Sequence, residues 1–251
     1  ALKNDITLLG SGDFHHVSLF LIEQFLPSIS VIIFDHHPDW FLLPPKKACG
    51  SWVSELSRNP NIGKIVLFGP SSDDLDALSM LTADLSSLDK NKLEIYPYKH
   101  SPSLSLLRRV PDNVSISNQR RIFYNKINWR ELRTDPLGIF SEVIQRLPSK
   151  QVYISIDKDC LRKEYALTNW EEGSLSLDEL LSMLDIIKSK LDIAGLDITG
   201  DYSYPRVRGK IKSYINRADH PRDYTARNKP QQLINEINEE TNLKILDLLS
   251  S

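Results

Sequence analysis

Carboxylate and imidazole side chains alternate at the end of an apolar segment near the N-terminus. Residues 29–33 read Ile-Ser-Val-Ile-Ile, and Asp35, His37 and Asp39 follow at every second position. On an extended chain, side chains two residues apart point the same way, so these three would project together. Two neighbouring carboxylates repel each other unless a cation lies between them. The pattern therefore predicts metal-ligand chemistry at the carboxyl end of a buried strand.

A second motif of the same kind lies far downstream. Residues 152–156 read Val-Tyr-Ile-Ser-Ile, and Asp157 and Asp159 follow them. A turn after a strand would also explain either motif alone, because Asp and Pro favour turns. In an open parallel sheet, however, the carboxyl ends of neighbouring strands meet at a topological switch point. If the two strands are neighbours, the candidate ligands that converge are Asp35, His37, Asp39, Asp157 and Asp159.

The N-terminal segment predicts the start of a βαβ unit. Residues 6–9 form an apolar strand, a turn with Gly10 and Gly12 follows, and residues 17–25 have a helical pattern. His15 and His16 lie at the helix start, as metal ligands or as polar surface residues. A phosphate-binding loop is disfavoured because the third glycine of that motif is missing.

The remaining elements alternate single strands with helices, which favours an α/β fold with parallel strand pairing. Ser176 and Glu179 form a capping box at the start of one helix. Residues 99–130 are harder to interpret and suggest short strands around 114–116 and 121–124. The other expected strands are 64–68, 93–96 and 191–198, and the expected helices are 135–146, 176–190 and 231–249.

Length and composition restrict the class of protein. A chain of 251 residues suffices for one α/β domain, and its 31 basic and 33 acidic residues give a net charge of −2. This balance predicts no nucleic-acid partner. No apolar segment reaches membrane-spanning length and the first residues do not resemble a signal peptide, so we expect a cytoplasmic protein with no membrane partner.

Basic residues accumulate after Asp201, between Arg206 and Lys229. A solvated arm or a contact between subunits of a homo-oligomer explains them better than a site for an anionic ligand.

Three of these motifs resemble those of the arginase and agmatinase (ureohydrolase) superfamily. The segment Gly12-Asp13-Phe14-His15 is similar to its Gly-Gly-Asp-His motif with one inserted residue. Residues 35–39 are similar to Asp-Ala-His-x-Asp, and residues 155–159 match Ser-x-Asp-x-Asp. The resemblance implies a three-layer α/β/α sandwich around a mostly parallel sheet. It also implies one metallohydrolase domain over residues 1–251, in which residues 202–251 form the basic arm and a C-terminal helix.

The resemblance further implies two Mn²⁺ ions bridged by a hydroxide, with Zn²⁺ or a single metal as alternatives. The hydroxide would cleave a C–N bond in a small guanidine, amidine or amide substrate. One ion would be held by His15 (or His16), Asp35, Asp39 and Asp157. The other would be held by Asp35, His37, Asp157 and Asp159.

The chain departs from the family pattern at two positions that, in the family, act on or bind the substrate. Cys49 stands in place of a proton-carrying histidine, although free cysteine is usually a small buried apolar residue. Asp201 lies one residue after the position of the glutamate that grips a guanidinium group. Together with Asp39, these two are the candidate catalytic residues, and arginine is not the expected substrate. Trp40, Trp52, Asn169 and Trp170 are candidate pocket walls, or core or loop residues.

Other functions stay open at this stage. A non-catalytic arginase-fold protein could keep the metal and bind a partner, and a deacetylase-like variant would use one Zn²⁺ on Asp35, His37 and Asp157. The run Asp35-His36-His37 also resembles the DHH-type phosphoesterases. The later glycine-rich motif of that family is missing here.

Overall fold

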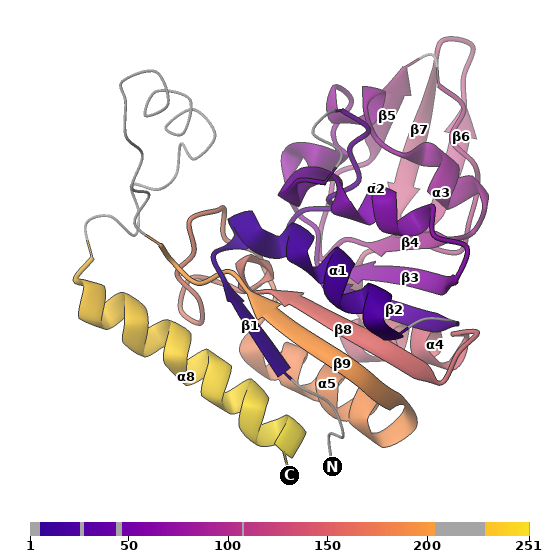
Figure 1. Cartoon of the computed structure of the whole chain (residues 1–251). Helices are drawn as coiled ribbons and strands as arrows, with labels where there is room; N and C mark the ends of the chain where they lie inside the picture. The colour runs from indigo at the N-terminus through magenta and orange to yellow at the C-terminus, as the bar shows by residue number, and fades with distance from the viewer. Residues whose placement is uncertain (1–5, 26–27, 44–46, 107, 204–228, 251) are drawn as a thin grey trace.

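A six-stranded sheet forms the centre of the molecule, and every pair of neighbouring strands in it is parallel (Figure 1). The computed structural model describes residues 6–25, 28–43, 47–106, 108–203 and 229–250. β2 is buried along its whole length, as expected of a β-branched strand in the middle of a parallel sheet. In sheet order the strands are β1 (Ile6–Gly10), β9 (Asp192–Thr199), β8 (Gln151–Asp157), β2 (Ile29–Phe34), β3 (Ile62–Phe68) and β4 (Leu93–Tyr96).

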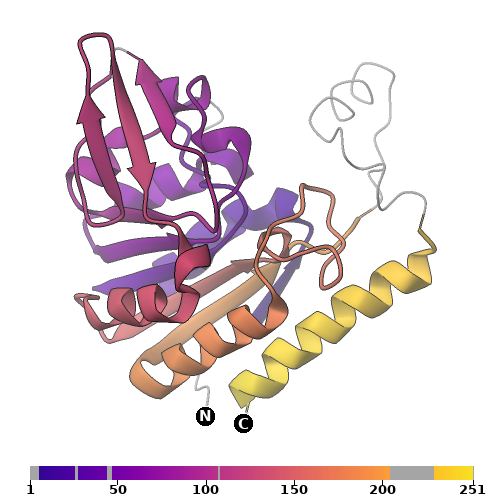
Figure 2. The ribbon, with the colours of Figure 1, turned by 180° about the vertical axis from the view of Figure 1, so that it is seen from behind.

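Helices cover both faces of this sheet, which confirms the expected α/β/α sandwich. Alternate residues of β2 supply the two cores: Val31 and Ile33 pack on one side, and Ile32 and Phe34 on the other. The first face carries α1 (Ser18–Ile22), α2 (Trp52–Ser57) and α3 (Leu85–Asp89). The opposite face, seen in Figure 2, carries α4 (Pro136–Gln145), α5 (Leu177–Lys190) and α8 (Gln231–Ser250). None of the helices described has the length and apolar character needed to cross a bilayer.

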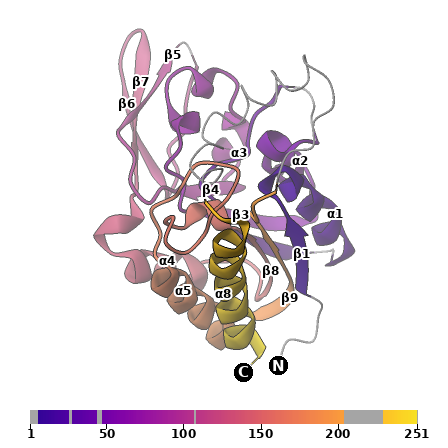
Figure 3. The same ribbon diagram turned by 90° about the vertical axis from the view of Figure 1, so that its left-hand side faces the viewer.

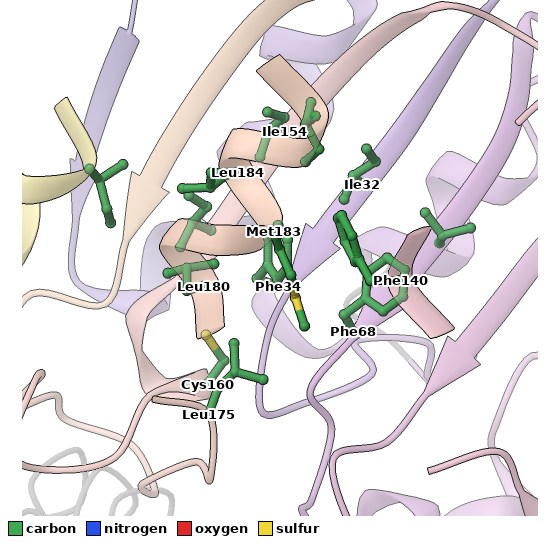
Figure 4. Packing of buried hydrophobic residues seen from close by; sticks show 14 of the residues in the cluster. Ile32, Phe34, Phe68, Phe140, Ile154, Cys160, Leu175, Leu180, Met183 and Leu184 are labelled. Atoms are coloured by element: carbon green, nitrogen blue, oxygen red, sulfur yellow. The ribbon is translucent and has the colours of Figure 1, made fainter. Parts of the chain in front are cut away.

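The core under α4 and α5 is built around an aromatic cluster (Figure 4). The rings of Phe34 and Phe140 have centroids 6.0 Å apart, and those of Phe68 and Phe140 are 4.8 Å apart. Such pairs stabilise a core by about 0.5–1.5 kcal/mol beyond the area they bury. Cys160 belongs to the same core and has no exposed surface.

α8 packs beside α5, as Figure 3 shows. Polar contacts fix it to the loop that follows β8. The Asn238 side chain donates to the Leu167 carbonyl (2.8 Å) and accepts from the Leu167 amide (2.9 Å), while the Thr241 hydroxyl donates to the Tyr165 carbonyl. The last helix thereby helps to shape the loop of residues 161–175.

Residues 103–106, 116–120 and 124–129 form a separate three-stranded antiparallel sheet, where the sequence had suggested only two short strands. The strand expected at 121–124 is wrong: these residues mostly form the connection between two strands, and Ile122 is 93% exposed. The strands are β5 (Ser103–Leu106), β6 (Ile116–Arg120) and β7 (Tyr124–Trp129). The basic residues expected to form an arm lie outside the described residues, apart from Lys229.

Candidate metal centre

The two acidic motifs meet at the carboxyl edge of the sheet. β2 and β8 are neighbours, and their register pairs Phe34 with Ile156. Asp35 follows β2 directly and Asp157 ends β8, so their side chains project from the same edge. Carboxylate oxygens of Asp35, Asp157 and Asp159 lie within 4.8 Å of one another.

His15 brings the third motif to this edge, from the 3-10 helix Gly12–Val17 that follows β1. Its ring is 1% exposed, and its Nδ1 lies 3.0 Å from Asp35 Oδ2, 3.4 Å from Asp39 Oδ2 and 3.6 Å from Asp157 Oδ2. Its Nε2 lies 2.9 Å from the Ser155 hydroxyl, which in turn donates to Asp197. This second contact leaves Nδ1 facing the carboxylates.

His16 lies elsewhere. Its ring is partly exposed, and its Nδ1 lies 3.1 Å from the backbone carbonyl oxygen of Asp13. Of the two candidate histidines, the structure brings His15 to the cluster.

His37 is oriented by a carboxylate that the sequence motifs did not reveal. Its Nδ1 lies 2.7 Å from Asp74 Oδ2, and its Nε2 faces Asp159 Oδ2 at 3.6 Å. The buried Nε2 of His37 has no hydrogen-bond partner in the described part of the chain. Imidazoles that bind metals commonly hold a carboxylate at the other nitrogen, which is the arrangement found here.

Asp39 reaches the cluster by a different route from the one expected. β2 ends at Phe34, so the chain is not extended as far as residue 39. Asp39 instead adopts a left-handed backbone conformation with φ +47°. The Trp52 indole N–H donates to Asp39 Oδ2 at 2.7 Å, and the Val53 amide donates to the Asp39 carbonyl. α2 therefore holds this carboxylate in place.

The charges of the cluster cannot all persist without a counter-ion. Burial, followed by the charge of Asp35, raises the pKa of Asp39 from 3.8 to about 7. Burial also raises the pKa of Asp157 to about 6 and that of Asp159 well above its ordinary value. Burial alone would lower the pKa of His15, but its contacts with Asp35 and Asp39 outweigh burial and raise it. Buried carboxylates with these shifted pKa values, beside an imidazole nitrogen of His37 that lacks a hydrogen-bond partner, fit a cation site.

Two glycines allow the backbone to approach Asp157. A Cβ at Gly12 would lie 2.9 Å from Asp157 Oδ2. Gly200 has φ +89°, and a Cβ there would lie 2.5 Å from Asp157 Oδ1. A side chain at either position would displace the carboxylate.

A cavity of about 200 Å³ opens over the cluster. Besides the acidic residues and histidines, Phe41, Cys49 and Trp170 line it. Burial and the charge of Asp39 raise the pKa of the Cys49 thiol to about 12, so the thiol is protonated near neutral pH in the absence of a cation. Of the other candidate wall residues, Trp40 lies in the core and Asn169 bonds to the backbone of Ser203.

Asp201 is not among the residues that line this cavity. It forms an ion pair with Lys158, which lies between the two acidic residues of the motif in sequence and has a fully buried side chain. The Lys158 ammonium group also lies 3.5 Å from the Asn238 carbonyl oxygen on α8.

Comparisons with known proteins indicate the fold group. No known protein-family profile matches the chain. An uncharacterised protein of Thermotoga maritima is 26% identical over 200 residues, which is 78% of this chain and 58% of that protein.

Solved structures resemble the chain more extensively. The proclavaminate amidino hydrolase of Streptomyces clavuligerus matches with a TM-score of 0.58 and 13% identity, over 98% of this chain and 63% of that enzyme. The arginase of Entamoeba histolytica matches with a TM-score of 0.56 and 14% identity, over 97% of this chain and 68% of that one. The arginase of Medicago truncatula matches with a TM-score of 0.54 and 16% identity, over 97% and 58% of the two chains. The chain therefore has the arginase-like fold, with a divergent sequence, and spans 58–68% of the length of these three structures.

Proposed function

We propose that the protein is a single-domain binuclear metallohydrolase that cleaves a C–N bond in a small guanidine, amidine or amide. One observation carries the proposal: buried imidazole and carboxylate groups from three distant segments converge, with carboxylate oxygens of Asp35, Asp157 and Asp159 within 4.8 Å of one another and His15 Nδ1 3.0 Å from Asp35. The likeness to an amidino hydrolase and two arginases supports the reaction class.

We assign two metal positions to the cluster. Mn²⁺ suits donor sets dominated by carboxylates. When bound, two such ions would lower the pKa of a water molecule and neutralise the negative charge that develops on the attacked group. The first metal position comprises His15, Asp35, Asp39 and Asp157. The second metal position comprises Asp35, His37, Asp157 and Asp159.

The chain's own residues orient these ligands and enclose the substrate. Ser155 fixes the ring of His15, Asp74 fixes that of His37, and Trp52 fixes Asp39. Fixed ligands cost no reorganisation during the reaction. Trp170 and Phe41 form the apolar part of the cavity wall, which restricts the reacting group to a small one.

Of the candidate catalytic residues, Cys49 has the better position. It lies on the cavity wall, where we propose that it carries a proton. Asp201 forms an ion pair with Lys158. We propose that it stabilises this lysine and does not bind the guanidinium group of a substrate. The substrate would then be recognised differently from arginine.

The test uses the full chain, stripped of metal and then supplied with Mn²⁺. We expect one to two equivalents of bound metal and turnover of a compound in a panel of guanidines, amidines, ureides and acetylated polyamines. Turnover should disappear again with a chelator. A protein that binds metal but turns over no compound would instead be a non-catalytic binding protein. A protein that binds no metal would refute the proposal.

A further inference from the structure

Two larger pockets adjoin the cavity that opens over the metal cluster. A cleft of about 540 Å³ shares Asp159 and Trp170 with the wall of that cavity. A groove of about 450 Å³ shares Phe41 and Gly50 with it. The cleft and the groove therefore meet the metal cavity at different parts of its wall, so that a bound molecule can extend from the cluster in two directions.

The groove is apolar. None of the described residues that line it carries a charged side chain. Its large side chains are those of Phe41, Leu43 and Leu78, and the two leucines are 59% and 79% exposed. A ligand that covers accessible apolar surface is stabilised, because that surface is removed from water. The groove thus fits an apolar group.

The cleft has an apolar floor and charged walls. Its buried apolar residues are Leu161, Ala166 and Leu167. Its charged residues, besides Asp159, are Lys163, Glu171, Glu172 and Lys229. An apolar group in this cleft would remove those charges from water without replacing their hydrogen bonds, which costs free energy. The cleft thus fits a polar group that can donate and accept hydrogen bonds.

The metal cavity itself favours a neutral reacting group. The carboxylates that line it are those of Asp35, Asp39, Asp74, Asp157 and Asp159. Four of them are the proposed metal ligands, and Asp74 Oδ2 lies 2.7 Å from His37 Nδ1. Among the described residues, no further carboxylate lines the cavity to pair with a guanidinium or amidinium ion, and an unpaired buried charge is costly. A neutral amide needs no such partner.

We propose that the substrate is an N-substituted amide, with its reacting group over the metal cluster, an apolar acyl chain in the groove and a polar amine part in the cleft. This inference rests on the proposed function and selects the amide among the three substrate classes named there. A terminal guanidine carries its substituent on one side of the reacting carbon only. It would therefore leave either the groove or the cleft empty.

Hydrolysis of such an amide consumes one water molecule. The water oxygen bonds to the carbonyl carbon, and the C–N bond breaks. The electron pair of that bond stays with the nitrogen, which takes up the proton that the water loses. The products are a carboxylic acid and an amine.

The experiment uses full-length protein loaded with Mn²⁺ and the N-(2-hydroxyethyl) amides of acetic, butyric and hexanoic acid. We expect kcat/KM to rise at least about tenfold from the acetyl to the hexanoyl compound, because each added CH₂ group is removed from water in the groove. N-Propylhexanamide replaces the hydroxyl group by a methyl group, and its kcat/KM should be at least about tenfold lower than that of the hexanoyl compound. Equal values across the acyl series, or an equal or higher value for N-propylhexanamide, would overturn the inference.

A pair of leucine variants tests the groove. Leu78→Asp should lower the ratio of kcat/KM between the hexanoyl and acetyl compounds by at least about tenfold, because it places a charge where the acyl chain lies. Leu243→Asp is the matched control, since Leu243 is 51% exposed on α8 and does not line the groove. It should retain the ratio of the unmodified protein.

Calorimetry on metal-free protein measures binding separately from turnover. The Kd of the hexanoyl compound should be at least about tenfold higher in Leu78→Asp than in the unmodified protein. Binding that depends on Leu78, without turnover after Mn²⁺ is added, would confirm the class of ligand and refute the proposed function. Turnover that depends neither on acyl length nor on Leu78 would refute this inference and leave the proposed function intact.

Discussion

Asp157 contributes to the centre through both of its carboxylate oxygens. Oδ2 faces His15, and Oδ1 accepts from the Asp159 amide at 3.1 Å. The carboxylate therefore shapes the turn that presents Asp159, and in the proposed centre it would also neutralise a cation. In the proposed centre it is also shared by the two metal positions.

Replacing this carboxylate tests the centre at a single residue. Asp157→Ala should reduce bound metal below one equivalent and lower turnover by at least about a hundredfold, because both positions lose a ligand. Metal content and single-substrate kinetics measure the two effects. The control is Glu239→Ala, which removes an exposed carboxylate from α8. An Asp157→Ala variant with full metal content and activity would contradict the ligand assignment.

Among the elements, the turn after β9 sets the space available to Asp157. Gly200→Ala should destabilise the fold by about 2–3 kcal/mol, since it combines an unfavourable backbone conformation with a clash. It should also lower metal affinity, because the new Cβ pushes on Asp157 Oδ1.

Gly10→Ala provides the matched control. Gly10 has φ +82°, but a Cβ there meets nothing within 4 Å. In this variant, backbone strain alone should lower the free energy of unfolding, by on the order of 1–2 kcal/mol, and metal affinity should be unchanged. Denaturant unfolding and metal titration of both variants separate strain from displacement of the ligand. Equal losses of metal affinity in the two would contradict the explanation.

The docking of α8 depends on Asn238. This side chain is 5% exposed, and Asn238→Ala would leave the backbone amide and carbonyl of Leu167 unpaired. We expect a loss of about 1–3 kcal/mol in the free energy of unfolding. Asn235→Ala, at an exposed position of the same helix, should change stability by less than about 0.5 kcal/mol. A similar effect of both substitutions would mean that these contacts do not secure the helix.

The sequence predicted the sheet better than it predicted the contacts at its edge. Apolar runs such as residues 29–33 identify a buried strand directly, and the capping box at Ser176 located the start of α5. The small sheet was harder to predict, because its strands β5 and β6 mix exposed and buried residues without long apolar runs.

The residues that support the ligands could not be predicted in the same way. Asp74, Asp197 and Glu171 lie far along the chain from the histidines and hydroxyl that they contact, and no local spacing marks them. Asp39 was predicted for a reason that does not apply, since its position comes from a left-handed turn and not from an extended strand.

For the molecule as a whole, the buried carboxylates predict how stability varies with pH. An acid whose pKa is higher in the folded than in the unfolded chain favours folding at low pH and loses this contribution as pH rises. For Asp39 the interval runs from 3.8 to about 7, and Asp157 acts in the same direction up to about 6. In metal-free protein, the contribution of these carboxylates to the free energy of unfolding should therefore decrease as the pH rises from 4 to 7.

Bound metal should reverse this trend, because it replaces the protons. We expect Mn²⁺ to raise the melting temperature more at pH 7.5 than at pH 5.5, where protons compete for the ligands. At a Mn²⁺ concentration one hundred times Kd, the free energy of unfolding should rise by about 2.7 kcal/mol. For a chain of this size, that raises the melting temperature by roughly 5–10 °C. Thermal unfolding with and without Mn²⁺ at both pH values measures it. A shift that is larger at pH 5.5 would argue against carboxylate and imidazole ligands.

Lys158 has a practical consequence for anyone who prepares shortened versions of this protein. Its buried ammonium group pairs with Asp201 and lies 3.5 Å from the Asn238 carbonyl oxygen of the final helix. A recombinant product that stops before residue 231 would open this region to solvent and remove that carbonyl. The segment that bears Asp157 and Asp159 would lose its contact with the final helix, so inactivity of such a fragment would say nothing about the activity proposed for the longer chain.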